Sequence, residues 1–112
     1  MLLSPIPHYL LGSDCTVRVP ADGDYGGEFA EPAGVAGVRL VPRAEMERSG
    51  YVFTDGESKG LLFVDAEASE GAFRFPVGSL VSVDGGPEMA VVKNSPIPGY
   101  WGEVHHWEVE LA

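Results

Sequence analysis

"LVSVDGGPEMAVV", residues 80–92, carries the strongest local structural signal in the sequence. Two runs of alternating apolar residues flank Asp84, Gly85 and Gly86, residue types that tolerate the positive φ angles of a tight hairpin turn. Pro87 then ends the turn, because proline cannot continue it into a regular ladder. We therefore predict two antiparallel strands, residues 80–84 and 89–93, joined by a hairpin.

The same pattern recurs along the whole chain. Short runs of apolar alternation, bounded by Gly, Pro and Asp, have the period of two that is typical of strands and not the 3.6-residue period of helices. "LLFVDA" is apolar on both faces, so we expect its strand to be covered on both sides. Six strands are predicted, at residues 15–19, 35–41, 61–65, 80–84, 89–93 and 104–111.

These strands predict an all-β fold in one domain, residues 1–112: a small, partly open antiparallel β-barrel of about six strands with long loops. We predict that residues 21–34 form a long hairpin tip. Their sequence is compatible with an extra strand pair around residues 25–29. Residues 43–50 have the only good helical propensity and predict at most one short helix. Residues 94–103 predict a loop stiffened by proline.

Composition narrows the function classes. The chain has 17 acidic and 7 basic residues, a net charge of −10, which repels phosphate backbones and argues against direct nucleic-acid binding. The single cysteine, Cys15, cannot form an intramolecular disulfide. The first residues lack the pattern of a signal peptide, and no apolar run has the length of a membrane span. We therefore expect a soluble protein of a reducing cytosol.

The adjacent histidines, His105 and His106, invite a metal or catalytic interpretation. In a regular strand they leave opposite faces, with His105 on the side of Trp107 and His106 on the solvent side with Glu108 and Glu110. No spacing supplies a third metal ligand, and no base or orienting group completes a nucleophile. We expect no catalytic residue, no metal and no cofactor. The predicted core side chains are Phe63, Val81, Val83, Trp107, Val109 and Leu111.

Several longer strings resemble one known family. "PIPHYLLGSDCTV" (5–17), "VRLVP" (38–42), "LLFVDAEAS" (61–69), "FPVGSLVSVDGG" (75–86) and "VHHWEVEL" (104–111) follow one another in that family's order. On these strings the chain resembles the small minor capsid proteins of tailed bacteriophages and prophages, of the head-completion or head-tail connector type. It departs from the family in its "DGGPEMAVV" hairpin and in the glycine-rich acidic loop at residues 21–34.

The resemblance implies a small β-barrel that forms a ring below the portal, closes the DNA-filled head and offers a surface to the tail. It implies no enzymatic activity and no cofactor. The implied partners are other copies of the chain and the portal and tail-side structural proteins, with no membrane. The implied location is the virion, after assembly in the bacterial cytoplasm.

Exposed aromatic and apolar residues are the candidates for ring contacts. Tyr100 and Trp101 either fold back to plug an open end of the barrel or dock on a neighbouring subunit, and the sequence leaves both alternatives open. The full set of candidate interface residues comprises Tyr9, Leu10, Leu11, Tyr25, Phe29, Tyr100 and Trp101.

Two other function classes are alternatives to a capsid protein. In a small ligand-binding barrel, Trp101, Trp107 and Phe63 would line an apolar pocket at the open end. In a hydrolase, His105 or His106 would act with a loop acid, but the sequence supplies none of the required geometry.

Overall fold

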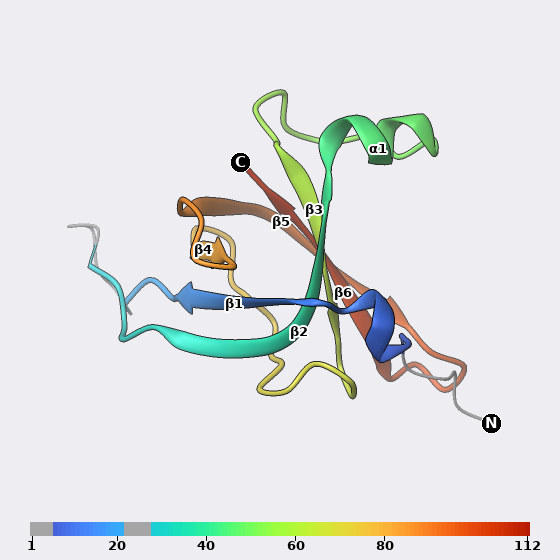
Figure 1. Cartoon of the computed structure of the whole chain (residues 1–112), viewed down its shortest axis with the longest axis horizontal. Coiled ribbons are helices and arrows are strands. Elements are labelled where there is room, and N and C mark those ends of the chain that lie inside the picture. Colours follow the sequence, from blue (N-terminus) through green and yellow to red (C-terminus); the bar gives the residue numbers. More distant parts are fainter. Residues whose placement is uncertain (1–5, 22–27) are drawn as a thin grey trace.

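The computed structural model describes residues 6–21 and 28–112. The described residues form six strands, a short 3-10 helix before them and one short α-helix between β2 and β3 (Figure 1). The elements in chain order are η1 (His8–Leu10), β1 (Ser13–Arg18), β2 (Ala33–Pro42), α1 (Arg43–Arg48), β3 (Gly60–Asp65), β4 (Leu80–Val83), β5 (Met89–Pro98) and β6 (Val104–Leu111). Neither described helix is long and apolar enough to cross a membrane.

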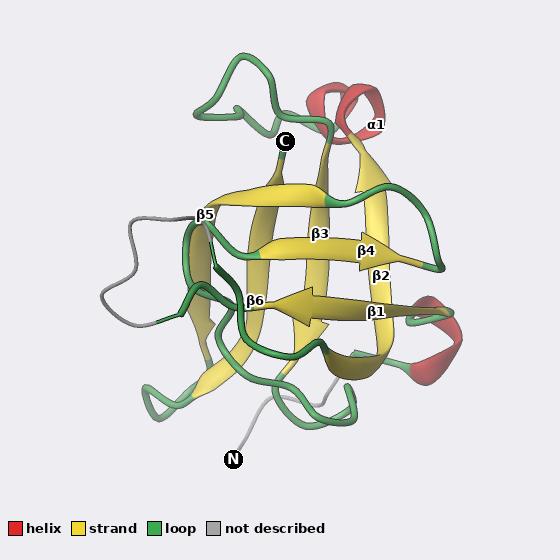
Figure 2. Cartoon of the chain, turned by 90° about the vertical axis from the view of Figure 1, so that its left-hand side faces the viewer, coloured by secondary structure: helices red, strands yellow, loops and turns green. Residues whose placement is uncertain are grey.

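The strands form one closed barrel in the order β1-β2-β3-β6-β5-β4, with every neighbouring pair antiparallel (Figure 2). The predicted all-β barrel of six strands is confirmed. It is closed where we expected it to be partly open, because β1 pairs with β4 from Cys15 opposite Val83 to Arg18 opposite Leu80. Closure pairs β1 with β4, so these two strands do not present the open edges at which sheets aggregate.

The hairpin turn between β4 and β5 has the predicted geometry. Asp84 has a φ of 51° and Gly85 a φ of 73°, the positive angles that the residue types at these positions tolerate. The backbone N–H of Asp14 donates a hydrogen bond to Oδ1 of Asp84 at 3.0 Å. The turn is therefore also tied to the start of β1.

The barrel interior is filled by alternating side chains from all six strands. Val81, Val109 and Leu111 are fully buried there, and Val83 and Trp107 pack against them, as predicted. The assignment of Phe63 to the core is wrong. Leu62 and Val64 point inward, so alternation sends Phe63 to the outer face, where its ring centroid lies 6.0 Å from that of His106.

Strand β3 is covered on both faces, as its apolar sequence predicts. Leu62 and Val64 fill the interior, whereas Leu61 is fully buried without belonging to the interior cluster. Helix α1 contacts both β2 and β3 and lies at one end of the barrel beside β3 (Figure 1). The predicted short helix is confirmed as α1, which has no fully buried residue of its own.

Strand β5 is longer than predicted. Residues 94–98, which we expected to be loop, pair with β6. Within the described residues, β4 pairs with β5 only at Met89 and Ala90. Residues 94–98 of β5 therefore have a paired strand, β6, on one side only. Pro96 and Pro98 lack an N–H and are tolerated on such a half-paired strand. The connecting turn is accordingly shortened to residues 99–103.

Cys15 on β1 should resist alkylation in the folded protein. Its side chain is buried, and burial together with the charges of Asp14 and Asp84 raises the pKa of the thiol to about 12. Because the thiolate is the reactive form, iodoacetamide at pH 8 should label the native chain far more slowly than the urea-unfolded chain. Mass spectrometry measures both rates, and equal labelling would contradict the burial of this thiol.

Candidate interaction surface

The two histidines at the start of β6 meet each other. On β5, Ile97 lies opposite His106 and Pro98 opposite Val104, which leaves His105 as an extra residue. Such a β-bulge breaks the alternation of side chains. The Nδ1 atoms of His105 and His106 are 2.8 Å apart, and the ring centroids are 5.1 Å apart. The prediction that the two rings face opposite sides is therefore wrong.

The chemistry of this pair is limited. At this distance one Nδ1 donates and the other accepts, so a single proton lies between the rings. Nε2 of His106 lies 3.1 Å from Oε2 of Glu108, which orients the second ring further. Among residues 6–21 and 28–112, no group of three or more His, Cys, Asp or Glu side chains could hold a metal ion. The pair fixes the orientation of the His106 side chain, which lies at the edge of a groove.

That groove has a volume of about 380 Å³ and lies on the outer face of the barrel beside η1. Phe63 and Leu10 contribute apolar wall, and Arg39, His106 and Glu108 contribute polar edges. The chain segment that forms one wall, residues 6–11, precedes β1 and crosses this face. The groove therefore depends on how this amino-terminal arm is held.

Asp65 at the end of β3 holds the arm. Its carboxylate is fully buried; Oδ2 accepts a hydrogen bond from the N–H of Ile6 at 2.8 Å, and Oδ1 accepts from Glu67 and Ala68. Burial alone would raise the pKa of Asp65, but these three bonds and the nearby His105 outweigh it and lower the pKa below its ordinary value. The charged form of Asp65 is thus the one that anchors the arm.

Replacing Asp65 with asparagine should release the arm selectively. The Asn oxygen can still accept from Glu67 and Ala68, whereas its NH₂ group would face the N–H of Ile6. A hydrogen bond to a charged group contributes about 1.5–3 kcal/mol, so amide exchange at Ile6 should accelerate by about 10-fold to 100-fold.

Asp55→Asn is the matched control, because Asp55 Oδ1 accepts only a local bond from Glu57 among the described contacts. Hydrogen exchange followed by NMR reads both variants. Unchanged protection of Ile6 in Asp65→Asn would show that the arm is held by other contacts.

Most candidate interface residues are exposed. Tyr9 is 84%, Trp101 71%, Tyr100 65% and Leu10 37% exposed. Tyr100 and Trp101 therefore do not plug the barrel, which excludes one of the two alternatives left open by the sequence. Figure 1 places η1 and the β5-β6 turn toward the same end of the long axis.

The remaining candidates differ. Leu11 is only 5% exposed and packs near Gly37, so its side chain stabilises the arm and is not available to a partner. Phe29 is half-buried, with the guanidinium of Arg18 5.0 Å from its ring centroid. Tyr25 and most of the proposed extra strand pair lie outside the described residues.

The β5-β6 turn holds its aromatic residues on a compact backbone. The N–H of Gly99 donates to the carbonyl of Glu103 at 2.7 Å, and the N–H of Trp101 donates to Oε1 of Glu103 at 2.8 Å. A side chain at position 99 would displace the Glu103 carboxylate and with it the hydrogen bond to Trp101. The turn thus presents Tyr100 and Trp101 outward from an ordered base.

Strand β6 also carries a buried carboxylate, that of Glu110, which we expected on the solvent side. Glu110 is 0% exposed. Its oxygens accept hydrogen bonds from Tyr51 Oη, from the backbone N–H and Oγ1 of Thr54, and from Ser58 Oγ, at 2.9–3.2 Å. Burial alone would raise the pKa of Glu110, but the bonds from Thr54 and Ser58 outweigh it and lower the pKa below its ordinary value.

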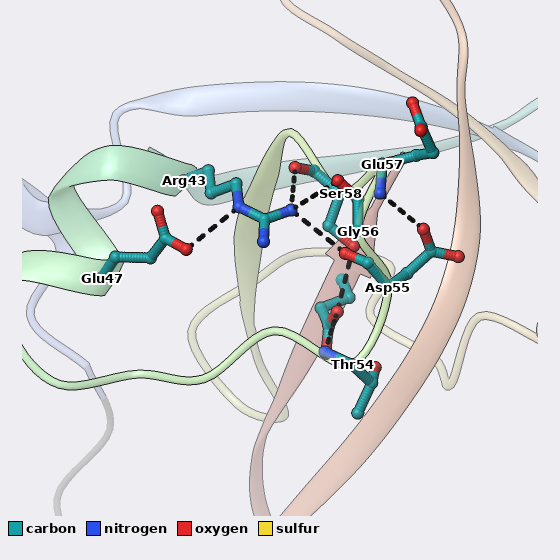
Figure 3. A network of polar contacts seen from close by, with 8 residues as sticks. Arg43, Glu47, Thr54, Asp55, Gly56, Glu57 and Ser58 are labelled. Carbon is teal, nitrogen blue, oxygen red and sulfur yellow. Dashed lines mark hydrogen bonds and ion pairs between the residues drawn. The ribbon is translucent and has the colours of Figure 1, made fainter.

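The segment over Glu110 is also fixed from α1. Figure 3 shows Arg43 donating to the carbonyls of Asp55, Gly56 and Ser58 at 3.0–3.1 Å while it pairs with Glu47 at 3.2 Å. Residues 51–58 are thereby held between Arg43 and Glu110. The sequence signal for this segment is the set of side-chain donors at positions 51, 54 and 58. Their role can be recognised only in the structure, where β6 and its Glu110 lie beneath them.

Comparison with known proteins decides the family. The family model described as "Minor capsid protein" matches residues 15–111, which include nearly all of the barrel. The chain belongs to the minor capsid protein family. A search of curated proteins and a search of solved structures each found no match. The family resemblance drawn from the sequence is thus confirmed, and this minor capsid protein has a structural role in a phage particle, where its partners are other phage structural proteins.

The ligand-binding alternative fails on geometry. Trp101 is largely exposed on the β5-β6 turn, Trp107 packs against the core, and Phe63 lies on the outer face. These three side chains do not converge on one pocket, and apolar side chains from all six strands fill the barrel interior. The groove beside η1 is a surface feature of the minor capsid protein, and Phe63 lines it whereas Trp101 and Trp107 do not.

Proposed function

We propose that this minor capsid protein joins the phage head to the tail as one subunit of a ring below the portal. The observation that carries the proposal is the family match over residues 15–111, which places a structural role on the barrel itself. The protein contributes to head completion by its shape and contacts and not by catalysis. It assembles in the host cytoplasm and remains in the virion.

The charge of the chain supports this position. A net charge of −10 surrounds each subunit with a negative potential, and like charges repel. Beside packaged DNA, an acidic ring keeps the nucleic acid from adhering to the channel through which it leaves. Specific recognition of DNA is therefore not part of the proposal.

The exposed aromatic residues support contacts with other proteins. Tyr and Trp are enriched in the cores of protein interfaces, and Tyr9, Tyr100 and Trp101 are each at least 65% exposed. A ring requires heterologous contacts, in which one patch of a subunit meets a different patch of the next. The β5-β6 turn and the region of η1 are two such distinct patches.

Removing the gene from the phage tests the proposal. Heads should still form and package DNA, but they should lack tails or lose DNA, as seen by electron microscopy and nuclease sensitivity. Supplying the wild-type chain in trans should restore infectious particles. Tailed, stable particles formed without the chain would contradict the proposed function.

A further inference from the structure

The β5-β6 turn carries an exposed indole, and the groove beside η1 has an apolar wall with one basic side chain. Trp101 is 71% exposed at the tip of the turn, and the groove of about 380 Å³ is open on the barrel's outer face. We infer that Trp101 of one copy docks in this groove on a second copy. The inference rests on the proposed ring, for which it names the contact between neighbouring subunits.

The groove has the lining that an indole ring requires. Phe63 and Leu10 supply apolar wall, and the guanidinium of Arg39 supplies a planar cation that can stack on an aromatic face. Arg39 has no ion pair within residues 6–21 and 28–112. Tyr9, which is 84% exposed in η1, extends the apolar surface beside the groove. A buried aromatic anchor in such a pocket is the usual centre of an interface.

One local pair of opposite charges, Glu103 on the turn and Arg39 in the groove, favours a second copy of the chain as the occupant. Two copies that each carry a net charge of −10 repel each other, so a contact between them needs an apolar centre and a local pair of opposite charges. The turn carries Glu103, which is bonded to the N–H of Trp101, and the groove carries Arg39. Glu108, the acidic group of the groove, is paired with His106 at 3.1 Å.

The turn and the groove lie toward the same end of the subunit but are formed by different residues, so a contact in which the turn of one copy occupies the groove of the next is heterologous. When the turn of one copy occupies the groove of a second copy, the groove of the first copy and the turn of the second copy are both still free. Contacts of this kind propagate and close into a ring when the rotation between subunits permits. A single contact of this small size is weak, so the isolated chain should associate only at high concentration.

Sedimentation velocity on the purified full chain tests the contact at concentrations up to the order of 1 mM, the range in which weak contacts are detected. The wild-type chain should associate reversibly. Trp101→Ala and Leu10→Asp should each remain monomeric and keep the native circular dichroism spectrum, because both residues are exposed. Val77→Asp is the matched control: Val77 is 64% exposed and not part of the groove, and this variant should associate like the wild type.

Mixing the two monomeric variants gives the sharper result. Trp101→Ala retains an intact groove, and Leu10→Asp retains an intact turn. Their mixture should form a one-to-one pair and nothing larger, because only one productive contact exists between them.

Three results would overturn the inference: a monomeric wild type at all concentrations, unchanged association of either variant, or no pair in the mixture. If phage particles require the chain and its Trp101 while the isolated chain stays monomeric, the groove or the turn binds a different particle protein. In that case the proposed function stands and the contact between copies does not.

Discussion

Replacing Val109 with aspartate is expected to leave the chain unfolded. Val109 is 0% exposed at the centre of β6, where it packs with Leu62, Val64 and Leu111 in the barrel interior. An unpaired carboxylate in such a place costs several kcal/mol, and the lost valine contacts add about 1.5–3 kcal/mol. Together these are comparable with the whole stability of a domain of this size.

Circular dichroism and the dispersion of the amide NMR spectrum measure this outcome. Val52→Asp is the matched control, because Val52 is 83% exposed and the chemical change is identical. The control should keep the native spectrum. A folded Val109→Asp chain would show that β6 does not bury this face in the barrel.

Replacing Glu110 with alanine is expected to lower the free energy of unfolding by about 3–4 kcal/mol. The substitution leaves the donors of Tyr51, Thr54 and Ser58 without their acceptor in a site that water does not reach. Hydrogen bonds to a charged group contribute about 1.5–3 kcal/mol each, although several bonds to one group do not add fully. Urea denaturation followed by tryptophan fluorescence measures the loss.

Glu108→Ala is the control on the same strand and the same face. Glu108 contacts His106, and its half-exposed side chain should contribute about 1 kcal/mol or less. The pKa of Tyr51 gives an independent readout. Burial, followed by the charge of Glu110, raises the pKa of Tyr51 to about 12, so the pKa should fall in Glu110→Gln. Equal stability of Glu110→Ala and Glu108→Ala would contradict the buried network.

The pH dependence of stability follows from the same carboxylate. The folded-state pKa of Glu110 is lowered from the ordinary value of 4.5. Its contribution is therefore fully present above pH 4.5 and is lost as the pH falls through the lower folded-state pKa. Asp65 and Asp84 have lowered pKa values as well and act with the same sign. Below pH 4.5 the wild type should lose stability more steeply than Glu110→Gln, and parallel slopes would exclude Glu110 as a contributor.

The strands were predictable because their signals are local. The turn at Asp84 and Gly85 is determined by residues that accept positive φ angles, and the apolar alternation in residues 80–83 and 107–111 follows from the one face of each strand that points into the barrel interior. Phe63 was misplaced because "LLFVDA" is apolar on both faces, and alternation alone does not say which face is the interior.

The outer surface was less predictable because it depends on contacts between distant segments. The bulge at His105 arises from the pairing of β6 with β5, and nothing within "VHHWEVEL" indicates an extra residue. Glu110 is buried only because residues 51–58 fold over it, more than fifty positions earlier in the chain. Exposure of Tyr100 and Trp101 likewise follows from the extension of β5 through two prolines.

The position of the chain in the assembled particle shows whether it joins the head to the tail. Cryo-electron microscopy of purified particles should show a ring of six-stranded barrels between the portal and the tail, with each β5-β6 turn against the neighbouring subunit. Particles whose portal vertex contains no such barrel, or that contain the barrel only elsewhere in the capsid, would contradict a role in joining head and tail.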